Sequence, residues 1–295
     1  MRILLTGASG QVGAALRVPL EAIGTVAILN RSQLDLSNPA RIPGVLSEVA
    51  PDLIINPAAY TMVDRAEDEA EIAYRVNAEA PRQIAAWAAA RATPFVHFST
   101  DYVFDGSGQQ PWREQDPTGP LSVYGASKLA GELAVRQANG PHLIVRTSWV
   151  YAAQGTNFLG TIARLARERS ELRIVADQVG APTPARLVAG IVSTIIGQCR
   201  SDLAARFADA GGVVNVATSG ETSWYGFATA IVDRLRVQGE QLQVESIVPI
   251  RAEDYPAKAR RPHNSRLDLT RLRRHFGIAP PSWENALAAE LLYIA

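Results

Sequence analysis

Short apolar runs alternate with Ala-, Leu- and Glu-rich stretches over the first half of the chain. The runs are rich in β-branched residues and have the length of strands, whereas the stretches between them are long enough for helices. Runs such as DLIIN at 52–56 are almost continuously apolar, which is typical of strands buried on both faces of a parallel sheet. The pattern predicts strands at 3–6, 26–29, 53–56, 95–99 and 143–147, and helices at 11–21, 39–49, 80–92 and 124–137.

This alternation predicts an α/β fold, a Rossmann-like doubly wound parallel sheet with helices on both faces. After about residue 148 the rhythm is less regular, and no low-complexity linker or internal repeat marks a boundary. We therefore predict a Rossmann domain over 1–148 and a smaller, mixed region over 149–295, parts of which return to the main sheet. That region is expected to contain helices at 157–168, 187–199 and 223–237, strands at 172–175 and 213–217, and a charged, proline-containing segment at 250–266.

Charge and composition exclude several classes of function. Lys and Arg together number 29, as do Asp and Glu, so no net positive charge favours nucleic acid or a membrane as a partner. The short basic run RLRRH at 271–275 is expected on a solvated helix face. Cys199 is the single cysteine and is predicted to be a buried, inert thiol. Because the chain shows neither a signal-peptide pattern nor an apolar stretch of membrane-spanning length, we expect a cytoplasmic protein.

Three glycines, Gly7, Gly10 and Gly13, follow the first predicted strand in LLTGASGQVGAAL. In a dinucleotide-binding β–α junction the first glycine permits a tight turn and the second lets the backbone approach the pyrophosphate. The third lets helix and strand pack closely, and the helix N-terminus favours the phosphate charge. A glycine triplet also occurs in plain turns, but its place in an alternating β–α pattern predicts a dinucleotide cofactor.

The residues after the second predicted strand indicate which dinucleotide is bound. Chains that bind NAD often carry an acidic residue there, which holds the ribose 2′-hydroxyl. This chain has Asn30, Arg31 and Ser32 instead, and an arginine at this place can bind the 2′-phosphate of NADP(H). We therefore predict NADPH, with NADH as the alternative if Arg31 simply faces solvent. Asp35 and Leu36 are predicted to border the adenine.

Two groups of polar residues follow later in the first half. Ser99, Thr100 and Asp101 come directly after the fourth predicted strand, and ligands of open α/β sheets bind beyond the carboxyl ends of strands. The alternative for these residues is a turn that closes the strand. Tyr124 and Lys128 are four residues apart in SVYGASKLAGE at 122–132, so they share a face of the predicted helix. Alone, such a pair is common on solvated faces.

Together, these residues predict the reduction of a ketone. Hydride transfer to a ketone leaves an alkoxide that needs a proton, which Tyr124 can supply. An unperturbed tyrosine titrates near ~10, and a lysine cation four residues away favours the phenolate and lowers that pKa. Lys128 can also hold the cofactor ribose, and Thr100 can hydrogen-bond the carbonyl oxygen or the tyrosine.

Seven motifs between residue 3 and about residue 267 make the chain resemble the extended short-chain dehydrogenase/reductases and, within them, the dTDP-4-dehydrorhamnose reductase family. STDYVFDG and RTSWVY are far more specific than the glycine triplet. The resemblance implies NADPH-dependent reduction of the C4 ketone of dTDP-4-dehydro-β-L-rhamnose to dTDP-β-L-rhamnose, the final step of dTDP-L-rhamnose biosynthesis. The other motifs are TGASGQVG, NPAAYTMVDRAE, PLSVYGASKLAGE, DQVGAPT and RRPHNSRL.

The resemblance also implies roles for single residues. Tyr124 would donate the proton, with Lys128 as its partner and Thr100 tuning the tyrosine. Thr100 and Asp101 would contact the sugar, and Trp149 would pack on it, core packing being the alternative for Trp149. Gly10, Gln11 and Val12 would hold the pyrophosphate, and Asn30, Asp35, Leu36, Ala59, Tyr60, Thr61 and Phe98 would line the rest of the cofactor, unless Phe98 only packs in the core.

The chain departs from its relatives where some of them hold magnesium at a dimer interface. Acidic residues found there in those relatives are replaced by Ala14-Ala15 after the glycine turn and by Pro184-Ala185-Arg186 after GAPT. An arginine is a poor neighbour for a divalent cation. The four histidines, His97, His142, His263 and His275, have no metal-ligand spacing. We therefore predict no metal, and a monomer or weak homodimer.

Two alternative functions stay open at this point. One is a nucleotide-sugar epimerase or 4,6-dehydratase of the same fold. Dehydratases typically carry Asp-Glu after the threonine, whereas this chain has Asp101-Tyr102, which favours plain reduction. The other is a regulatory homologue that binds NADP without catalysis, against which the intact set of Thr100, Tyr124 and Lys128 argues.

Overall fold

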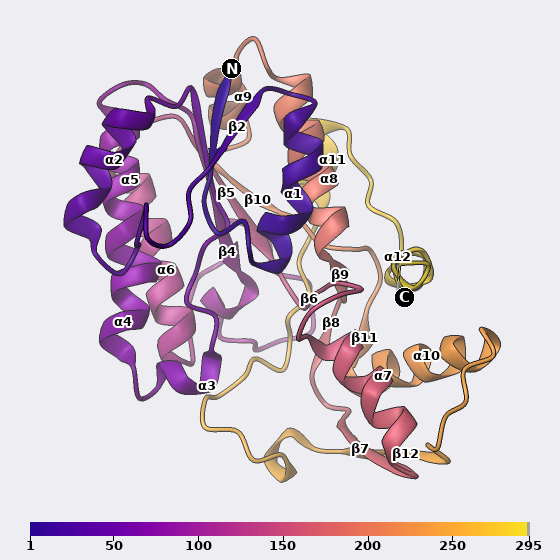
Figure 1. The fold of residues 1–295 in the computed structure, drawn as a ribbon. Helices are drawn as coiled ribbons and strands as arrows, with labels where there is room; N and C mark the ends of the chain where they lie inside the picture. The colour runs from indigo at the N-terminus through magenta and orange to yellow at the C-terminus, as the bar shows by residue number, and fades with distance from the viewer. Residues whose placement is uncertain (294–295) are drawn as a thin grey trace.

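The computed structural model describes residues 1–293 and has an open, six-stranded parallel sheet at its centre (Figure 1). Its order is β2-β1-β3-β4-β5-β10, and all neighbouring strands are parallel. Because β2 and β3 lie on opposite sides of β1, the connections leaving β1 and β3 diverge and open a crevice beyond the carboxyl ends. The strands are β1 (Arg2–Leu5), β2 (Thr25–Ile28), β3 (Leu53–Asn56), β4 (Phe95–Thr100), β5 (His142–Thr147) and β10 (Val213–Asn215).

Alternate residues of the central strands enter two separate cores, one on each face of the sheet. Ile3 and Leu5 of β1 belong to one core, whereas Leu4 belongs to the other. In β3, Ile54 likewise points away from its two neighbours. Burial on both faces explains why these strands read as continuous apolar runs rather than as an alternation.

Helices cover both faces of the sheet (Figure 1). One strand and three helices of this unit come from residues beyond 149, so the later part of the chain completes the main sheet and its core. One layer consists of α2 (Ile42–Val49), α5 (Ala80–Ala89) and α6 (Val123–Gln137), and the other of α1 (Gln11–Glu21), α8 (Ala185–Gln198), α9 (Leu203–Asp209) and α11 (Thr270–Phe276).

A smaller body with its own core lies at the carboxyl-end side of the sheet (Figure 1). Its core joins Ile162, Phe227 and Leu287 from three helices to Leu172 of a short parallel ribbon. Two further two-stranded pairs connect this body to the end of β5. Its elements are β6 (Val150–Tyr151), α7 (Phe158–Glu168), β7 (Glu171–Val175), β8 (Val179–Gly180), β9 (Thr183–Pro184), β11 (Thr222–Ser223), α10 (Trp224–Val237), β12 (Ser246–Ile250) and α12 (Trp283–Leu291).

The predicted α/β fold is confirmed, and most predicted elements are present within one or two residues. Two helices differ from the prediction. The helix expected at 39–49 starts as a 3₁₀ turn, η1 (Pro39–Arg41), and becomes α2 only at Ile42, with a proline in its first turn. The helix expected at 80–92 ends at Ala89, because the chain turns there and Ala92 takes a positive φ of 52°. The division at residue 148 stays a prediction.

Several elements were not predicted, and most of them are too short to give a periodic signal. No helix formed by residues 1–293 has both the length and the apolar character needed to cross a membrane. Cys199 is buried and unpaired, as predicted, and the inertness of its thiol stays a prediction. The unpredicted elements are α3 (Val63–Ala66), α4 (Ala70–Tyr74), the π-helical turn η2 (Arg75–Glu79), η3 (Asp101–Val103), β6, β8, β9, α9, β11, β12, η4 (Ala252–Asp254) and α12.

Candidate active site

The glycine turn connects β1 to α1, and its three glycines differ in what surrounds them. Gly7 has a positive φ of 56°, and a Cβ placed on it would lie 2.7 Å from the Ala58 Cα. A Cβ on Gly13 would lie only 2.0 Å from the Gly7 carbonyl oxygen. These two glycines are therefore required by the protein's own backbone, one for the turn and one for the close packing of helix on turn.

Gly10 is not crowded by the protein. A Cβ there would meet only the Gly7 carbonyl oxygen, at 3.4 Å, and Gly10 itself is exposed with an ordinary φ of −79°. No side chain caps α1 at this end, and the Gln11 Oε1 is buried without a hydrogen-bond partner among residues 1–293. Bare helix N–H groups and an uncrowded glycine fit a phosphate-bearing ligand at Gly10, Gln11 and Val12, whereas the Gln11 Oε1 is an acceptor and needs a donor.

The residues after β2 leave Arg31 free to bind an anion. Its side chain is 82% exposed, and its only ion pair within residues 1–293 is with Asp35, at 3.5 Å between Nε and Oδ1. Asn30 shapes the turn, because its Oδ1 accepts hydrogen bonds from the N–H groups of Ser32 and Gln33. Hydrogen bonds from Ser37 hold the pKa of Asp35 below its usual value, and Leu36 is buried in the core.

The loop after β3 is held by a residue that the sequence analysis did not select. Asn77 accepts a hydrogen bond from the Tyr60 N–H (2.8 Å) and donates to the Tyr60 carbonyl (3.0 Å) and to the Ser127 Oγ (3.0 Å). It thereby joins the 59–61 loop to α6, between Tyr124 and Lys128. Ala59 and Tyr60 are half-buried and Thr61 is exposed, and the Tyr60 hydroxyl donates to the Glu69 Oε2 at 2.5 Å.

Asn77 lies in the π-helical turn η2, and π-turns occur often at functional sites. The turn packs directly on α6, because a Cβ on Gly131 would lie 2.1 Å from the Asn77 carbonyl oxygen. The available sequence signal was Gly131 in KLAGE, a glycine inside a helix that usually marks close packing. The partner of that packing could not be read from the sequence.

Thr100 and Asp101 lie at the carboxyl end of β4 and are nearly fully buried. The Thr100 Oγ1 donates to the Asp101 Oδ1 (3.1 Å) and accepts from the Tyr102 N–H (3.2 Å). Burial raises the pKa of Asp101 to about 6, against hydrogen bonds from Ser265 and Thr100 that lower it. The Ser99 Oγ and the Asp101 Oδ2 are buried without partners among residues 1–293, so they are available to a polar ligand.

The ring and the backbone carbonyl of Phe98 have different contacts. Its ring is 6% exposed and belongs to the core on the α1 side of the sheet, as its core-packing alternative expected. Its backbone carbonyl accepts a hydrogen bond of 2.6 Å from the Lys128 Nζ. Lys128 is therefore held against β4 by the main chain of Phe98, at one side of the crevice.

Helix α6 carries Tyr124 and Lys128 on one face and begins at a Ser122 cap, whose Oγ accepts from the Gly125 N–H at 3.2 Å. A Cβ on Gly125 would lie 2.3 Å from the Tyr102 carbonyl oxygen, so this glycine lets the helix start approach η3 closely. The Tyr124 ring meets the Tyr102 ring edge-on at 5.5 Å. The structure thus brings Tyr124 next to Thr100 and Asp101.

The ionisation of the Tyr–Lys pair differs from the sequence-based expectation. Burial raises the pKa of Tyr124 to about 12, Thr100 acts in the opposite direction, the charge of Asp101 raises it further, and Lys128 is not among the causes. Burial lowers the pKa of Lys128 to about 8, while Glu132 raises it. In the protein alone, Lys128 therefore does not depress the tyrosine pKa, because its Nζ is directed to the Phe98 carbonyl. Tyr124 keeps its proton at neutral pH, as a proton donor must.

Trp149 lies two residues beyond the end of β5, whose last residue, Thr147, pairs with Thr100 of β4. It is therefore next to Thr100 and Asp101 along the carboxyl edge of the sheet. Its side chain is 9% exposed and stacks on Trp224. The hydroxyls of Thr147 and Ser148 beside it are buried without partners among residues 1–293.

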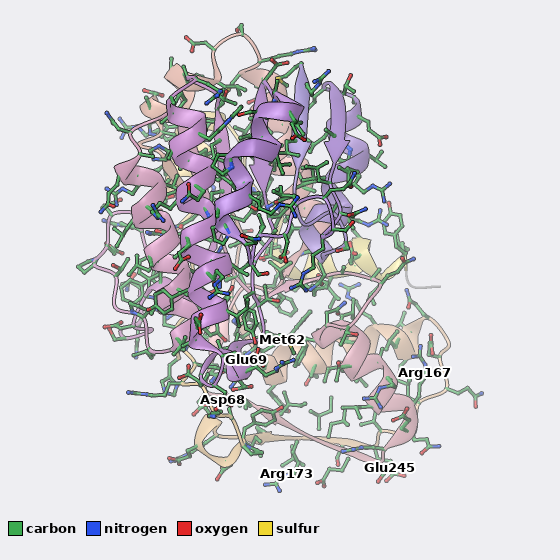
Figure 2. All side chains as sticks on the ribbon, turned by 60° about the vertical axis from the view of Figure 1, so that its left-hand side comes forward. Met62, Asp68, Glu69, Arg167, Arg173 and Glu245 are labelled. Carbon is green, nitrogen blue, oxygen red and sulfur yellow. The ribbon has the colours of Figure 1, made fainter. Side chains whose placement is uncertain are left out.

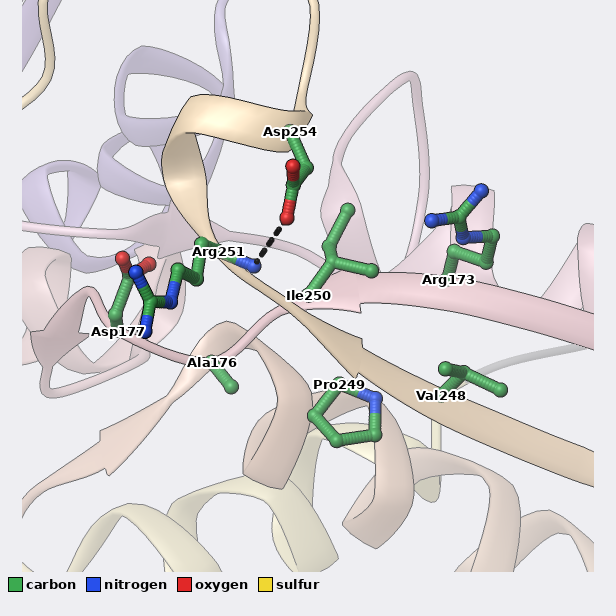
Figure 3. A pocket seen from close by; sticks show the side chains of 8 residues that line it. All are labelled: Arg173, Ala176, Asp177, Val248, Pro249, Ile250, Arg251 and Asp254. Carbon is green, nitrogen blue, oxygen red and sulfur yellow. Dashed lines mark hydrogen bonds between the residues drawn. The ribbon is translucent and has the colours of Figure 1, made fainter.

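A separate depression of about 450 Å³ lies on the β7–β12 ribbon of the smaller body (Figure 3). Arg173, Asp177, Arg251 and Asp254 give it a mixed charge, and none of the predicted site residues lines it. Figure 2 shows Arg173 on this ribbon, apart from Met62, Asp68 and Glu69 at the end of the larger body. Among residues 1–293, no group of three or more His, Cys, Asp or Glu side chains is arranged to hold a metal ion.

Arg186 lies in the segment after GAPT, where the resemblance implies metal-binding acidic residues in some relatives. Its side chain contacts two residues of its own chain. Its Nε lies 3.8 Å from the Glu290 Oε1, and its guanidinium lies 3.6 Å over the Tyr293 ring. The Glu290 Oε1 also accepts a hydrogen bond from the Ala153 N–H. Arg186 thus attaches α8 to α12.

Comparisons with known proteins agree with this geometry. The model of the family described as RmlD substrate binding domain matches residues 1–293. A dTDP-4-dehydrorhamnose reductase of Burkholderia thailandensis is 47% identical over 290 residues, which cover 97% of each chain. One from Escherichia coli K12 is 41% identical over 96% of this chain and 95% of its own. The crystal structure of a dTDP-4-dehydrorhamnose reductase from Bacillus anthracis in complex with NADP has a TM-score of 0.89 at 34% identity, covering 99% of this chain and 98% of that one.

Proposed function

The chain belongs to the RmlD substrate binding domain family and, within it, to the dTDP-4-dehydrorhamnose reductases, and we propose that it reduces dTDP-4-dehydro-β-L-rhamnose with NADPH. The product is dTDP-β-L-rhamnose, and the reaction is the final step of dTDP-L-rhamnose biosynthesis. The observation that carries the proposal is the meeting of Thr100, Tyr124 and Lys128 at the carboxyl edge of a sheet whose first turn is built for a dinucleotide.

Tyr124 is proposed as the proton donor. NADPH, when bound, supplies the hydride to the C4 carbon of the sugar. The C4 oxygen then becomes an alkoxide, which is a much stronger base than a phenolate, so the Tyr124 hydroxyl transfers its proton to it. Because burial raises the Tyr124 pKa to about 12, the tyrosine holds its proton throughout the neutral range. Thr100, which lowers the Tyr124 pKa against the effect of burial, is proposed to orient the tyrosine hydroxyl.

Lys128 is proposed to hold both the cofactor ribose and the tyrosine. Its Nζ already donates to the Phe98 carbonyl, which leaves two further donor positions on the ammonium group. With a pKa of about 8, it is mostly charged at neutral pH. In the protein alone this charge does not act on the Tyr124 pKa, and we propose that in the complex it comes close enough to Tyr124 to stabilise the phenolate that remains after proton transfer.

The remaining cofactor contacts are proposed from the fit of the glycine turn and of Arg31. Gly10, Gln11 and Val12 would hold the pyrophosphate with main-chain N–H groups, and the exposed Arg31 would bind the 2′-phosphate. Binding of that phosphate would cost Arg31 only a weak, exposed ion pair with Asp35. NADH, which lacks the 2′-phosphate, would then be the poorer donor. Asn30, Asp35, Leu36, Ala59, Tyr60, Thr61 and Phe98 are proposed to line the adenine, ribose and nicotinamide.

Thr100, Asp101 and Trp149 are proposed to bind the sugar. Asp101 presents a buried carboxylate oxygen without a partner among residues 1–293, which a sugar hydroxyl would satisfy. We also propose that the protein works in the cytoplasm, without metal, as a monomer or weak homodimer. The internal contacts of Arg186 with Glu290 and Tyr293 support the absence of a metal at that place.

A coupled assay tests the proposed function. Purified protein is mixed with NADPH and enzymatically made dTDP-4-dehydrorhamnose, the loss of NADPH absorbance is followed, and the product is identified by NMR. A GDP-linked 4-ketosugar serves as the matched control. We expect oxidation of NADPH with the dTDP sugar and much less with the control. NADPH binding without oxidation would identify a regulatory homologue, and a protein that purifies with tightly bound NAD and needs no NADPH would be an epimerase or dehydratase.

A further inference from the structure

Trp149 has an unusual backbone conformation at the end of β5. Its φ is +48°, in the left-handed region that residues other than glycine seldom adopt. Such a conformation costs free energy and persists only where the surrounding structure imposes it, most often at a functional site. The contacts of the indole ring show what imposes it here.

One face of the Trp149 indole is covered by Trp224. The two rings are nearly parallel, with an interplanar angle of 10°, and their centroids are 3.6 Å apart. This is a direct stack, so no further group fits on that face. Trp224 is itself supported by Phe158, at 4.6 Å between ring centroids.

The other face is covered by the main chain of Gly180. A Cβ placed on Gly180 would lie 2.6, 2.9 and 3.0 Å from the Cε2, Cδ2 and Cζ2 atoms of Trp149. Three bonded ring atoms at nearly equal distances place that Cβ over the face of the ring, because a point beyond the edge would lie much farther from Cδ2. It cannot be on the face that Trp224 occupies. Gly180 must therefore lack a side chain for the indole to fit.

Main-chain hydrogen bonds and strand pairing fix Trp149, Gly180 and Trp224 relative to one another. Gly180 belongs to β8, which pairs antiparallel with β11, and β11 leads directly into Trp224 at the start of α10. The Trp149 carbonyl accepts a hydrogen bond from the Thr183 N–H at 3.1 Å. The arrangement is therefore fixed from three sides, and the ring cannot tilt without moving a β-pair.

Only an edge of the indole is left for a ligand. The N–H groups of Trp87 and Trp112 donate to the Ser47 Oγ (2.9 Å) and the Asn264 carbonyl (3.0 Å). Among residues 1–293, the indole N–H groups of Trp149, Trp224 and Trp283 have no acceptor, and of these three Trp149 is the one that follows β5 next to Thr100 and Asp101. The Trp149 Nε1 is not one of the fully buried atoms, so it is accessible to solvent and, in the complex, to an oxygen of a bound ligand.

We propose that Gly180 and Trp224 are positioning residues that hold Trp149 edge-on to the substrate, so that its indole N–H donates a hydrogen bond to an oxygen of the sugar nucleotide instead of stacking on the sugar ring. This inference rests on the proposed function for the identity of the substrate. It revises the expectation that Trp149 packs on the sugar with its face, because both faces are already covered.

Four variants of the full-length protein test the inference. Gly180→Ala adds a methyl group over the ring, and Gly190→Ala is its control, since a Cβ on Gly190 meets nothing within 4 Å. Trp224→Ala removes the stack, whereas Trp224→Phe keeps an aromatic ring there. The measured quantities are kcat and KM for dTDP-4-dehydrorhamnose and the Kd for NADPH.

We expect Gly180→Ala and Trp224→Ala to raise the KM for the sugar nucleotide by roughly tenfold or more, because a small misplacement of a binding group is costly. Trp224→Phe should restore most of the affinity, Gly190→Ala should behave as wild type, and the Kd for NADPH should change little in all four. If Gly180→Ala does not fold, Trp224→Ala alone decides the point. A wild-type KM in Trp224→Ala would overturn the inference.

A fifth variant, Trp149→Phe, distinguishes a hydrogen bond from the indole edge from stacking of the sugar on the ring face. It keeps an aromatic face but loses the N–H group, so we expect KM to rise by roughly twofold to tenfold, the effect of one hydrogen bond. If the sugar stacked on the ring, Trp149→Phe would be nearly neutral and Trp224→Ala would tighten binding by freeing a face. Either of these results would overturn the inference.

A spectroscopic measurement distinguishes failure of the inference from failure of the proposed function. Two indoles stacked at 3.6 Å couple strongly and give a paired exciton band in far-ultraviolet circular dichroism. We expect this band in the wild-type protein without any substrate, and its loss in Trp149→Phe and Trp224→Phe. Its absence from the wild type would overturn the packing on which the inference rests. A wild type that shows the band but does not oxidise NADPH with the dTDP sugar would instead refute the proposed function.

Discussion

Arg146 and Glu132 form a bidentate ion pair in which neither side chain is more than 2% exposed. The Nε donates to the Glu132 Oε1 at 2.9 Å and the Nη2 to the Oε2 at 2.6 Å, while the Nη1 donates to the Glu114 carbonyl at 3.1 Å. Arg146 lies in β5, three residues before Trp149, and Glu132 lies one turn of α6 after Lys128. The pair therefore fixes the helix of the tyrosine and lysine to the strand that carries the tryptophan.

Loss of one partner should be far more damaging than loss of both. We expect Glu132→Gln to lower the free energy of unfolding by about 3–5 kcal/mol, because it leaves a buried guanidinium charge uncompensated. The double variant Glu132→Leu with Arg146→Met should lose much less. Urea denaturation measures both. Glu168→Gln is the control, since Glu168 pairs with Arg164 on an exposed helix face and should contribute less than about 1 kcal/mol. Equal effects of Glu132→Gln and Glu168→Gln would contradict this account.

Tyr124→Phe tests the proton donor. We expect kcat to fall by roughly 10²–10⁴, the usual contribution of a positioned acid, while the Kd for NADPH stays within a few-fold of wild type. Single-turnover measurements with NADPH would show that the loss lies in the chemical step. Tyr74→Phe, at a partly exposed tyrosine of α4 outside the site, is the control. Substantial turnover by Tyr124→Phe would require another acid, and Asp101 would be the first to examine.

The sheet and the glycine turn could be predicted from the sequence because their signals are local. The apolar run at 53–56 and the three glycines at 7–13 each carry their own physical reason within a few residues. The Tyr124–Lys128 pair could also be placed, since a separation of four residues fixes a shared helix face. In each case the structural element follows from neighbours in the chain.

The rest depends on contacts between distant segments. Asn77 acts through a π-helical turn that no periodic pattern shows, and it binds Tyr60 and Ser127, 17 and 50 residues away. The orientation of Trp149 is set by Gly180 and Trp224, so the sequence alone indicated a site residue but not how it faces the site. The pKa of Tyr124 was expected to fall because of Lys128, whereas burial, which depends on the whole fold, raises it.

Arg31→Ala tests the choice between NADPH and NADH. The side chain is exposed and pairs only weakly with Asp35, so its removal should not affect folding. We expect kcat/KM for NADPH to fall by about tenfold, the scale of a charge-assisted hydrogen bond to phosphate, with kcat/KM for NADH nearly unchanged. Rising salt should weaken NADPH binding in the wild type more than in the variant. An unchanged NADPH-to-NADH ratio would show that Arg31 faces solvent in the complex.

Asp101→Asn should raise the free energy of unfolding at pH 7.5 although it lowers activity. Burial raises the pKa of Asp101 to about 6 in the folded protein, above its unfolded value of 3.8, so folding favours the protonated form. The favourable contribution of the Asp101 carboxyl to the free energy of unfolding is present below about pH 4 and is lost as the pH rises through 6. An uncharged asparagine avoids this loss, so at pH 7.5 the variant should be more stable by about 2–3 kcal/mol and close to wild type at pH 4.

Thermal unfolding at the two pH values measures this difference, and activity should fall at both. Asp105→Asn is the control, because hydrogen bonds from Ser107 lower the pKa of that exposed carboxyl and its substitution should give no stabilisation at pH 7.5. If Asp101→Asn were destabilising at pH 7.5, the buried carboxylate would have to be compensated by groups other than Ser265 and Thr100.

Gly10→Ala and Gly13→Ala should separate cofactor binding from folding within one turn. A Cβ on Gly13 would lie 2.0 Å from the Gly7 carbonyl oxygen, a main-chain atom that cannot move aside, so Gly13→Ala should fold poorly or not at all. A Cβ on Gly10 meets only that same oxygen, at 3.4 Å, and Gly10 has an ordinary φ. Gly10→Ala should therefore still fold, at a cost of about 0.5–2 kcal/mol for placing alanine at the N-cap of α1. It should bind NADPH at least tenfold more weakly, because the methyl group takes the place of the pyrophosphate. Isothermal titration with NADPH beside urea denaturation gives both quantities. Unchanged NADPH affinity in a folded Gly10→Ala protein would mean that the pyrophosphate does not approach this glycine.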